Sequence, residues 1–314
     1  MKKITVFLGV ILMLTLCVEK ASAQYYFYDN KYYDNPVTFE LGGSIAAMNC
    51  FTDLGGNKGI GKKFVKDLNL GKTQLAGSIS LTAMYNYMFA LRLEATFGSV
   101  TAEDKVLKKV APSTFGRYER NLSFKSKITD FMLGLEIHPL YILNSFSMDD
   151  EKEPPLFSPY LLAGVGFFSF KPQAKLTNGK WIDLQPLSTE GQGFAEYPDR
   201  KPYKLNQLNL PLGLGVKYEL GSTLSLRAEF VYRKINTDYL DDVSSLYYID
   251  PTLYANYFTG AKLTNALLLN DRRYELDPTN NKTSDERGNP NNKDAFFTFN
   301  VKIGYTFGRQ KINR

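Results

Sequence analysis

Apolar and polar residues alternate with a period of two over most of this chain. The most regular stretch spans 208–233, where leucine, valine, alanine, phenylalanine or tyrosine at every second position alternates with glycine or polar residues. Because successive side chains of a strand point to opposite faces, this pattern predicts strands with one apolar and one polar face. Gly221 and Ser222 predict a tight turn between the two halves, so the stretch is expected to form a β-hairpin.

The same alternation predicts eight strands. They span residues 37–48, 74–86, 89–100, 127–139, 158–170, 208–220, 223–233 and 295–307. Four of the connections are long: 49–73, 101–124, 171–204 and 239–294. Long connections that alternate with short ones are typical of outer-membrane barrels, whose short turns face the periplasm. The predicted fold is therefore all-β: an eight-stranded antiparallel transmembrane β-barrel spanning 37–307.

A soluble barrel of the lipocalin type is the alternative fold, because alternation alone does not show which face is outward. Lipocalins enclose a ligand with apolar side chains and expose polar ones. Here the polar face is rich in charges and glycine, which favours a polar interior in a barrel that barely accommodates its own side chains.

Both ends of the chain carry recognisable segments. Lys2 and Lys3, an apolar run over 4–18 and Ala21-Ser22-Ala23 predict a signal peptide over 1–23, and therefore export to the cell outer membrane. Residues 24–36 form an aromatic N-terminal arm, expected to be mobile or anchored at lipid headgroups, with a docking arm as the alternative. Residues 308–314 form a short basic tail. Outer-membrane lipids are the first expected partner.

Composition excludes several kinds of function. The net charge of +6 is too balanced to indicate nucleic acid as a partner. Beyond the leader, Cys50 is the one cysteine and His138 the one histidine, so neither a disulfide nor a Cys/His metal site is expected. No Ser/His/Asp grouping is visible, and we expect no cofactor and no enzymatic activity. The segment 56–63 nearly matches a phosphate-binding loop, but Lys63 replaces the required Ser or Thr, which favours a flexible basic loop.

The polar face of the predicted strands carries charges of both signs. The residues expected inside the barrel are Glu40, Arg92, Glu94, Asp130, Glu136, Lys217, Glu219, Arg227, Glu229, Arg233 and Lys302. Mixed charges can pair, which predicts a salt-bridged plug. A proton or ion path is the alternative interpretation.

Several segments resemble the PorG-like outer-membrane barrel proteins of Bacteroidota. They are Asn49–Gly56, Phe157–Gly166, Gly179–Gly193, Leu210–Tyr218 and Tyr232–Ser244, the last with its Thr-Asp-Tyr-Leu-Asp-Asp-Val-Ser core. The resemblance implies a non-enzymatic structural component of the type IX secretion and gliding apparatus. Such a protein anchors a periplasmic ring, made of a lipoprotein and its partner, to the outer membrane.

Two of these segments supply candidate partner-binding residues. They are Trp181, Asp183, Gln185, Glu190, Asp238, Tyr239, Leu240, Asp241 and Asp242. The aspartates lack the spacing of a calcium loop, so we expect an acidic and aromatic surface patch rather than a metal site. By the predicted topology this patch lies on the outer loops, although the ring is periplasmic. Either the loops serve another purpose, or docking uses the short turns and termini, or the loops fold in unexpectedly.

Two other functions fit the same sequence. One is a general OmpA-like barrel that stabilises the envelope or adheres to surfaces. The other is an outer-membrane lipid-modifying enzyme that would depend on His138.

Overall fold

The computed structural model describes residues 32–33, 36–55, 69–108, 114–145, 157–221, 223–279, 285–308 and 310–311. The predicted signal peptide, the segment 56–63, most of the N-terminal arm and most of the basic tail lie outside the described residues.

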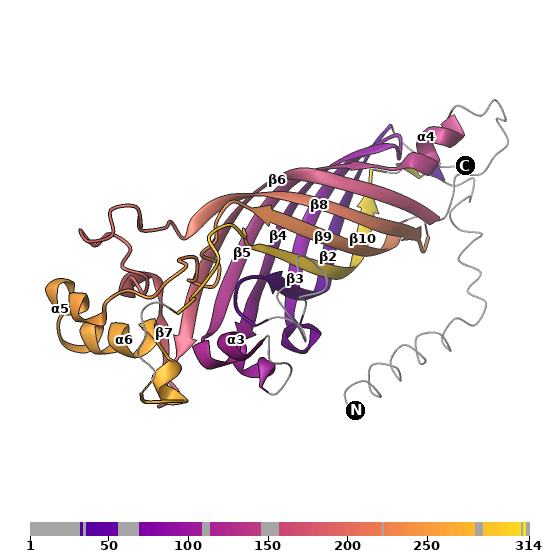
Figure 1. The fold of residues 1–314 in the computed structure, drawn as a ribbon. Helices are drawn as coiled ribbons and strands as arrows, with labels where there is room; N and C mark the ends of the chain where they lie inside the picture. The colour runs from indigo at the N-terminus through magenta and orange to yellow at the C-terminus, as the bar shows by residue number, and fades with distance from the viewer. Residues whose placement is uncertain are drawn as a thin grey trace.

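Eight long strands close into one antiparallel barrel (Figure 1). They are β2 (Val37–Phe51), β3 (Gln74–Tyr85), β4 (Phe89–Glu103), β5 (Ser123–Ile137), β6 (Phe157–Lys175), β8 (Asn206–Glu219), β9 (Leu224–Ile235) and β10 (Ala295–Phe307). Each pairs with its neighbour along the chain, and β10 closes the barrel by pairing with β2 from Ala295 opposite Phe51 to Phe307 opposite Phe39. All eight predicted strands are present, and several extend further toward the long connections than predicted.

One end of the barrel carries the short connections, and we call it the short-turn end. Residues 86–88 connect β3 to β4, and Asn86 and Tyr87 have φ of 47° and 59°, as the two central residues of a type I′ turn require. Helix α4 (Pro139–Ser145) follows β5 at this end. A two-stranded sheet pairs β1 (Tyr32–Tyr33) with β11 (Gln310–Lys311).

The four long connections gather at the opposite end, where Figure 1 shows α3, α5, α6 and β7 together. We call their described residues the cap. Its elements are η2 (Leu70–Lys72), η3 (Asp104–Leu107), α3 (Phe115–Arg120), β7 (Trp181–Asp183), η5 (Gln185–Leu187), η6 (Pro251–Leu253), α5 (Tyr254–Tyr257), α6 (Gly260–Asn270) and η7 (Arg273–Glu275). Among the described residues, no helix is long and apolar enough to cross a membrane.

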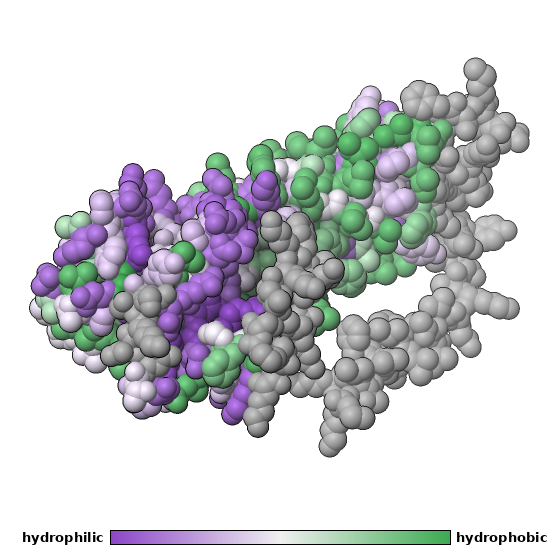
Figure 2. Space-filling view, in the orientation of Figure 1, coloured by the Kyte–Doolittle hydropathy of each residue, from purple (hydrophilic) through white to green (hydrophobic). Residues whose placement is uncertain are grey.

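The outer wall of the barrel is an apolar belt, green in Figure 2. On β6 the outward residues run from Phe157 to Phe167, and both ends of this run are about half exposed. Ten residues of strand rise about 33 Å, and a tilt of roughly 40° reduces this to about 25 Å, the height of the apolar band of a membrane barrel. A soluble monomeric protein rarely exposes a contiguous apolar surface of this size to water. The structure thus confirms the transmembrane β-barrel and rejects the lipocalin alternative.

Near the cap, the inward face of the strands becomes apolar and the outward face becomes polar. Phe168, Phe170 and Phe296 point inward and are at most 1% exposed, whereas Lys127 and Lys171 point outward. An apolar interior with a polar exterior is the arrangement of a barrel in water. The strands therefore continue past the membrane boundary, which lies close to Phe131 and Phe167.

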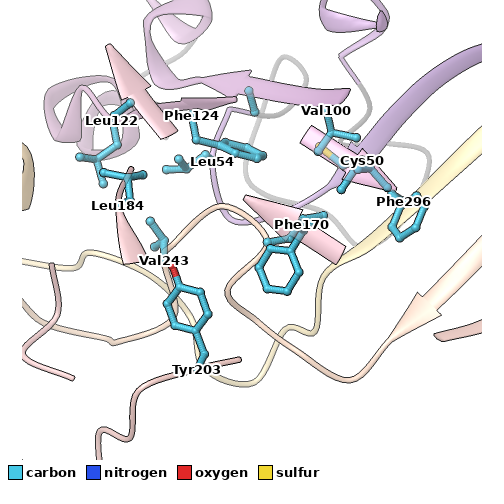
Figure 3. Close-up of a cluster of buried hydrophobic side chains, with 14 of the residues drawn as sticks. Cys50, Leu54, Val100, Leu122, Phe124, Phe170, Leu184, Tyr203, Val243 and Phe296 are labelled. Atoms are coloured by element: carbon cyan, nitrogen blue, oxygen red, sulfur yellow. The ribbon is translucent and has the colours of Figure 1, made fainter. Parts of the chain in front are cut away.

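The apolar interior at this end continues into the cap as one cluster, part of which is drawn in Figure 3. Phe170 and Phe296 from the barrel lie in the same cluster as Leu184, Val243 and Leu269 from the cap. The last long connection contributes to this cluster, because it forms α5 and α6 and inserts buried apolar side chains there.

Candidate functional site

Arg92 lies at the centre of the barrel interior and contacts three carboxylates. Its Nη2 is 2.6 Å from Glu229 Oε2, its Nη1 is 3.1 Å from Glu136 Oε1, and its Nε is 3.3 Å from Glu94 Oε2. All four side chains are fully buried. The fixed fork of a guanidinium suits such a site, because it can hold several carboxylate oxygens at once.

Toward the short-turn end the ion pairs continue without a break. Arg227 lies 2.9 Å from Glu136 Oε2 and 2.7 Å from Glu40 Oε1. Lys217 Nζ then joins Glu40 Oε2 at 3.1 Å and Glu219 Oε1 at 2.8 Å. Each carboxylate in this segment therefore meets at least one buried cation.

Toward the cap, the buried ion pairs extend as far as the apolar cluster. Lys302 Nζ lies 2.6 Å from Glu94 Oε2. Arg233 Nε lies 2.6 Å from Asp130 Oδ2, and its guanidinium carbon is 5.4 Å from the ring centroid of Phe296. The ring of Phe296 thus marks the point at which the polar interior gives way to the apolar one.

The structure places all eleven predicted interior charges inside the barrel, each at most 5% exposed. Six are carboxylates and five are cations, and every one takes part in an ion pair. Near-complete neutralisation gives this interior little net field with which to attract ions of one sign. We call these eleven residues the ionic column; its geometry is that of a plug.

His138 belongs to a hydrogen-bonded group that was not expected from the sequence. Its Nδ1 lies 2.9 Å from Ser158 Oγ, and its Nε2 lies 3.2 Å from Glu136 Oε2. This is the order of a nucleophile, a base and an orienting acid. However, Ser158 is 2% exposed, and Glu136 also binds Arg92 and Arg227. The group therefore satisfies polar atoms inside the barrel and is closed to a substrate. Glu136 lies on β5 and Ser158 on β6, so the sequence shows the group only when the β5–β6 register is known.

Asp242 lies in the cap, where it accepts hydrogen bonds from the hydroxyls of Thr189 and Tyr203. Burial raises the pKa of Asp242 to about 7, against the opposing effect of these two hydrogen bonds and of Arg287. The carboxyl group thus joins the connection 236–294 to the connection 176–205.

Glu190 and Arg287 form a buried ion pair across the same two connections. Glu190 also accepts hydrogen bonds from the backbone N–H of Ser244 at 3.0 Å and from the hydroxyl of Ser245 at 2.7 Å. A carboxylate with this many donors is fully satisfied, so the charge is compatible with burial.

We call the segment 237–244 the acidic run; besides Asp242 it contains Asp238 and Asp241. Asp238 accepts a hydrogen bond from Ser244 Oγ at 2.8 Å, and burial raises its pKa to about 7. Asp241 accepts from the backbone N–H of Val243 at 3.0 Å and of Leu54 at 3.2 Å. Burial raises the pKa of Asp241 well above its usual range. The contact with Leu54 attaches the first long connection to the last.

The expected exposed patch is therefore wrong for most of its residues. Glu190, Asp238, Leu240, Asp241 and Asp242 are at most 2% exposed. The acidic side chains turn inward because hydroxyl groups, backbone N–H groups and Arg287 satisfy them there, whereas Leu240 packs in the apolar cluster. In the part of the chain that the structure describes, no three acidic, histidine or cysteine side chains are placed to hold a metal ion.

The other candidates lie nearer the surface. Trp181 is 45% exposed on β7, and Asp183 beside it pairs with Lys171 of β6 at 2.8 Å. Gln185 donates to the backbone carbonyl of Tyr203, whose ring stacks on Tyr239 at 4.6 Å. The candidate set thus divides between the outer edge of β7 and the packed interior of the cap.

Comparison with known proteins does not identify a family for this chain. No protein-family model matches this sequence, and no curated protein matches it. Among solved structures, the outer membrane protein OprG from Pseudomonas aeruginosa is 12% identical, with a TM-score of 0.38 and coverage of 89% of this chain and 99% of that one. Neisserial surface protein A is 9% identical, with a TM-score of 0.37 and coverage of 88% and 99%. A major outer membrane protein from Thermus thermophilus is 12% identical, with a TM-score of 0.36 and coverage of 87% and 100%. Strand pairing and the apolar belt, rather than these likenesses, establish the fold.

Proposed function

We propose that this protein is a non-enzymatic outer-membrane barrel that acts as a structural anchor of a type IX secretion and gliding apparatus. The observation that carries a structural role is the ionic column, because a barrel filled with paired charges is neither a conduit nor a reaction chamber. The resemblance of several segments to PorG-like proteins supports the specific apparatus. The expected signal peptide and the apolar belt support the outer membrane.

Outer-membrane barrels place short turns in the periplasm and long loops outside. With that orientation the cap faces outward, and the short-turn end faces the periplasmic ring. Helix α4 presents Leu143 there with 64% of its surface exposed. Beside it, Tyr141 is buried and stacks on the ring of Tyr87 at 5.4 Å. We therefore propose that the ring lipoprotein and its partner contact the short-turn end, while the acidic run holds the cap together.

Co-purification from detergent-solubilised outer membranes tests this proposal. Leu143→Asp is expected to remove the ring proteins from the purified barrel, because it places a charge in the proposed contact. Leu246→Asp is the matched control, since Leu246 is 39% exposed on the cap. Absence of ring proteins from the unaltered barrel would contradict the assignment. Intact export of type IX cargo in a deletion strain would instead favour an OmpA-like envelope-stabilising role.

A further inference from the structure

Two lysines face each other on the outer wall, just beyond the apolar belt. Lys127 of β5 is directly opposite Lys171 of β6 in the strand register. Opposed residues of antiparallel strands have Cα atoms about 4.5–5.5 Å apart, and like charges at such positions repel. An anion between them would convert this repulsion into a stabilising contact.

More lysines extend the pair into a patch. Lys125 and Lys175 lie further toward the cap on the same outward face, and Lys175 is in register with Trp181 of β7. Among the described residues, Asp183 is the carboxylate that the structure pairs with these lysines. Burial opposes ionisation of Asp183, yet hydrogen bonds from Lys171 and Gln173 and the charges of Lys171 and Lys127 lower its pKa. One carboxylate among four lysines leaves the patch strongly positive.

The height of the patch matches the level of lipid headgroups. Lys127 and Lys171 each lie four residues beyond the last outward phenylalanine of their strand, Phe131 and Phe167. Four residues correspond to about 13 Å along a strand, or roughly 10 Å above the belt at a tilt of roughly 40°. Headgroup layers begin directly above the hydrocarbon core, and flexible lysine stems can bend toward them. Trp181 at the same end is a residue type typical of membrane interfaces.

We propose that Lys125, Lys127, Lys171 and Lys175 bind the phosphate groups of a phosphorylated lipid in the outer leaflet of the membrane. The proposal rests on the orientation given under the proposed function, with the cap outside. Neighbouring lysines on two strands match a headgroup with more than one phosphate, because each phosphate can accept several charge-assisted hydrogen bonds.

Native mass spectrometry of the purified full-length barrel tests the site with diphosphorylated lipid A as the probe. Dephosphorylated lipid A and inorganic phosphate serve as comparison ligands. The variant Lys127→Gln/Lys171→Gln/Lys175→Gln is compared with Lys201→Gln/Lys262→Gln/Lys293→Gln, which removes the same charge from exposed positions on the cap. A lysine at an anionic lipid surface contributes about 1 kcal/mol, so three correspond to a loss of affinity of about a hundredfold.

The expected result is this loss in the first variant, near-normal binding in the second, and weak binding of dephosphorylated lipid throughout. Equal binding by both variants would overturn the proposal, as would full competition by inorganic phosphate, which would show that the lipid part is not recognised. Lys127→Gln alone removes one of the two opposed charges and is expected to weaken binding several-fold. Lipid binding that depends on these lysines in a barrel that co-purifies without ring proteins would refute the proposed function and leave the lipid site standing.

Discussion

Replacing Arg92 by methionine tests whether the ionic column is a dry plug. The substitution removes the cation that lies within 3.3 Å of Glu94, Glu136 and Glu229. Lys302 still contacts Glu94, and Arg227 still contacts Glu136. Glu229 is left with Lys302 at 3.9 Å as its nearest cation. Breaking a buried pair by removing one partner costs about 3–5 kcal/mol, so we expect a loss of this order in the free energy of unfolding.

The assay is urea unfolding of the barrel in lipid vesicles, followed by the gel shift between folded and heated forms. Arg92→Lys keeps the charge but loses the fork, and it should be less destabilised. Arg92→Met/Glu229→Gln removes a charge of each sign and should recover part of the loss, because partners in contact couple by about 0.5–3 kcal/mol. A loss below about 1 kcal/mol for Arg92→Met would refute the reasoning, since such values are typical of pairs screened by water.

Three more predictions concern the cap and His138. The folded-state pKa of Asp238 and Asp242, about 7 against an ordinary value of 3.8, means that the folded cap binds more protons than the unfolded one. Its opening free energy, measured by hydrogen exchange corrected for intrinsic rates, should therefore fall as pH rises from about 5 to 8, and Asp242→Asn should flatten this dependence. Glu190→Gln leaves Arg287 without its charged partner, so limited proteolysis should cut the cap several-fold faster while the barrel stays folded. Ser158→Ala should leave the lipid A of the outer membrane unchanged by mass spectrometry; a change would revive the lipid-modifying alternative.

The barrel could be predicted because the alternation that defines each strand is visible among neighbouring residues of the sequence. A strand between lipid and a polar interior must alternate residue by residue, so Lys217, Glu229 and Lys302 show in the sequence which face they occupy. The prediction ended this strand at Phe170, whereas β6 continues to Lys175. Its outward and inward faces change from one character to the other at Phe167 and Phe168, two adjacent apolar residues. The first points to lipid and the second into the apolar cluster.

The cap could not be predicted because the contacts that hold it together join residues far apart in the sequence. Asp241 accepts a hydrogen bond from the backbone of Leu54, 187 residues away in the sequence. Glu190 pairs with Arg287, 97 residues away. An aspartate-rich segment is usually solvated, and nothing near it in the sequence indicates that donors from other connections will bury it. Helix α6 has 11 residues, too few for its periodicity to stand out.

Site-specific photo-cross-linking at the two ends of the barrel tests the central claim most directly. A cross-linking residue at Leu143 probes the short-turn end, and one at Tyr247, which is 50% exposed on the cap, probes the outer end. We predict that the Leu143 position cross-links the periplasmic ring lipoprotein or its partner in intact cells and that the Tyr247 position does not. Cross-linking of the ring from Tyr247 alone, or from neither position while the ring is assembled, would contradict the account.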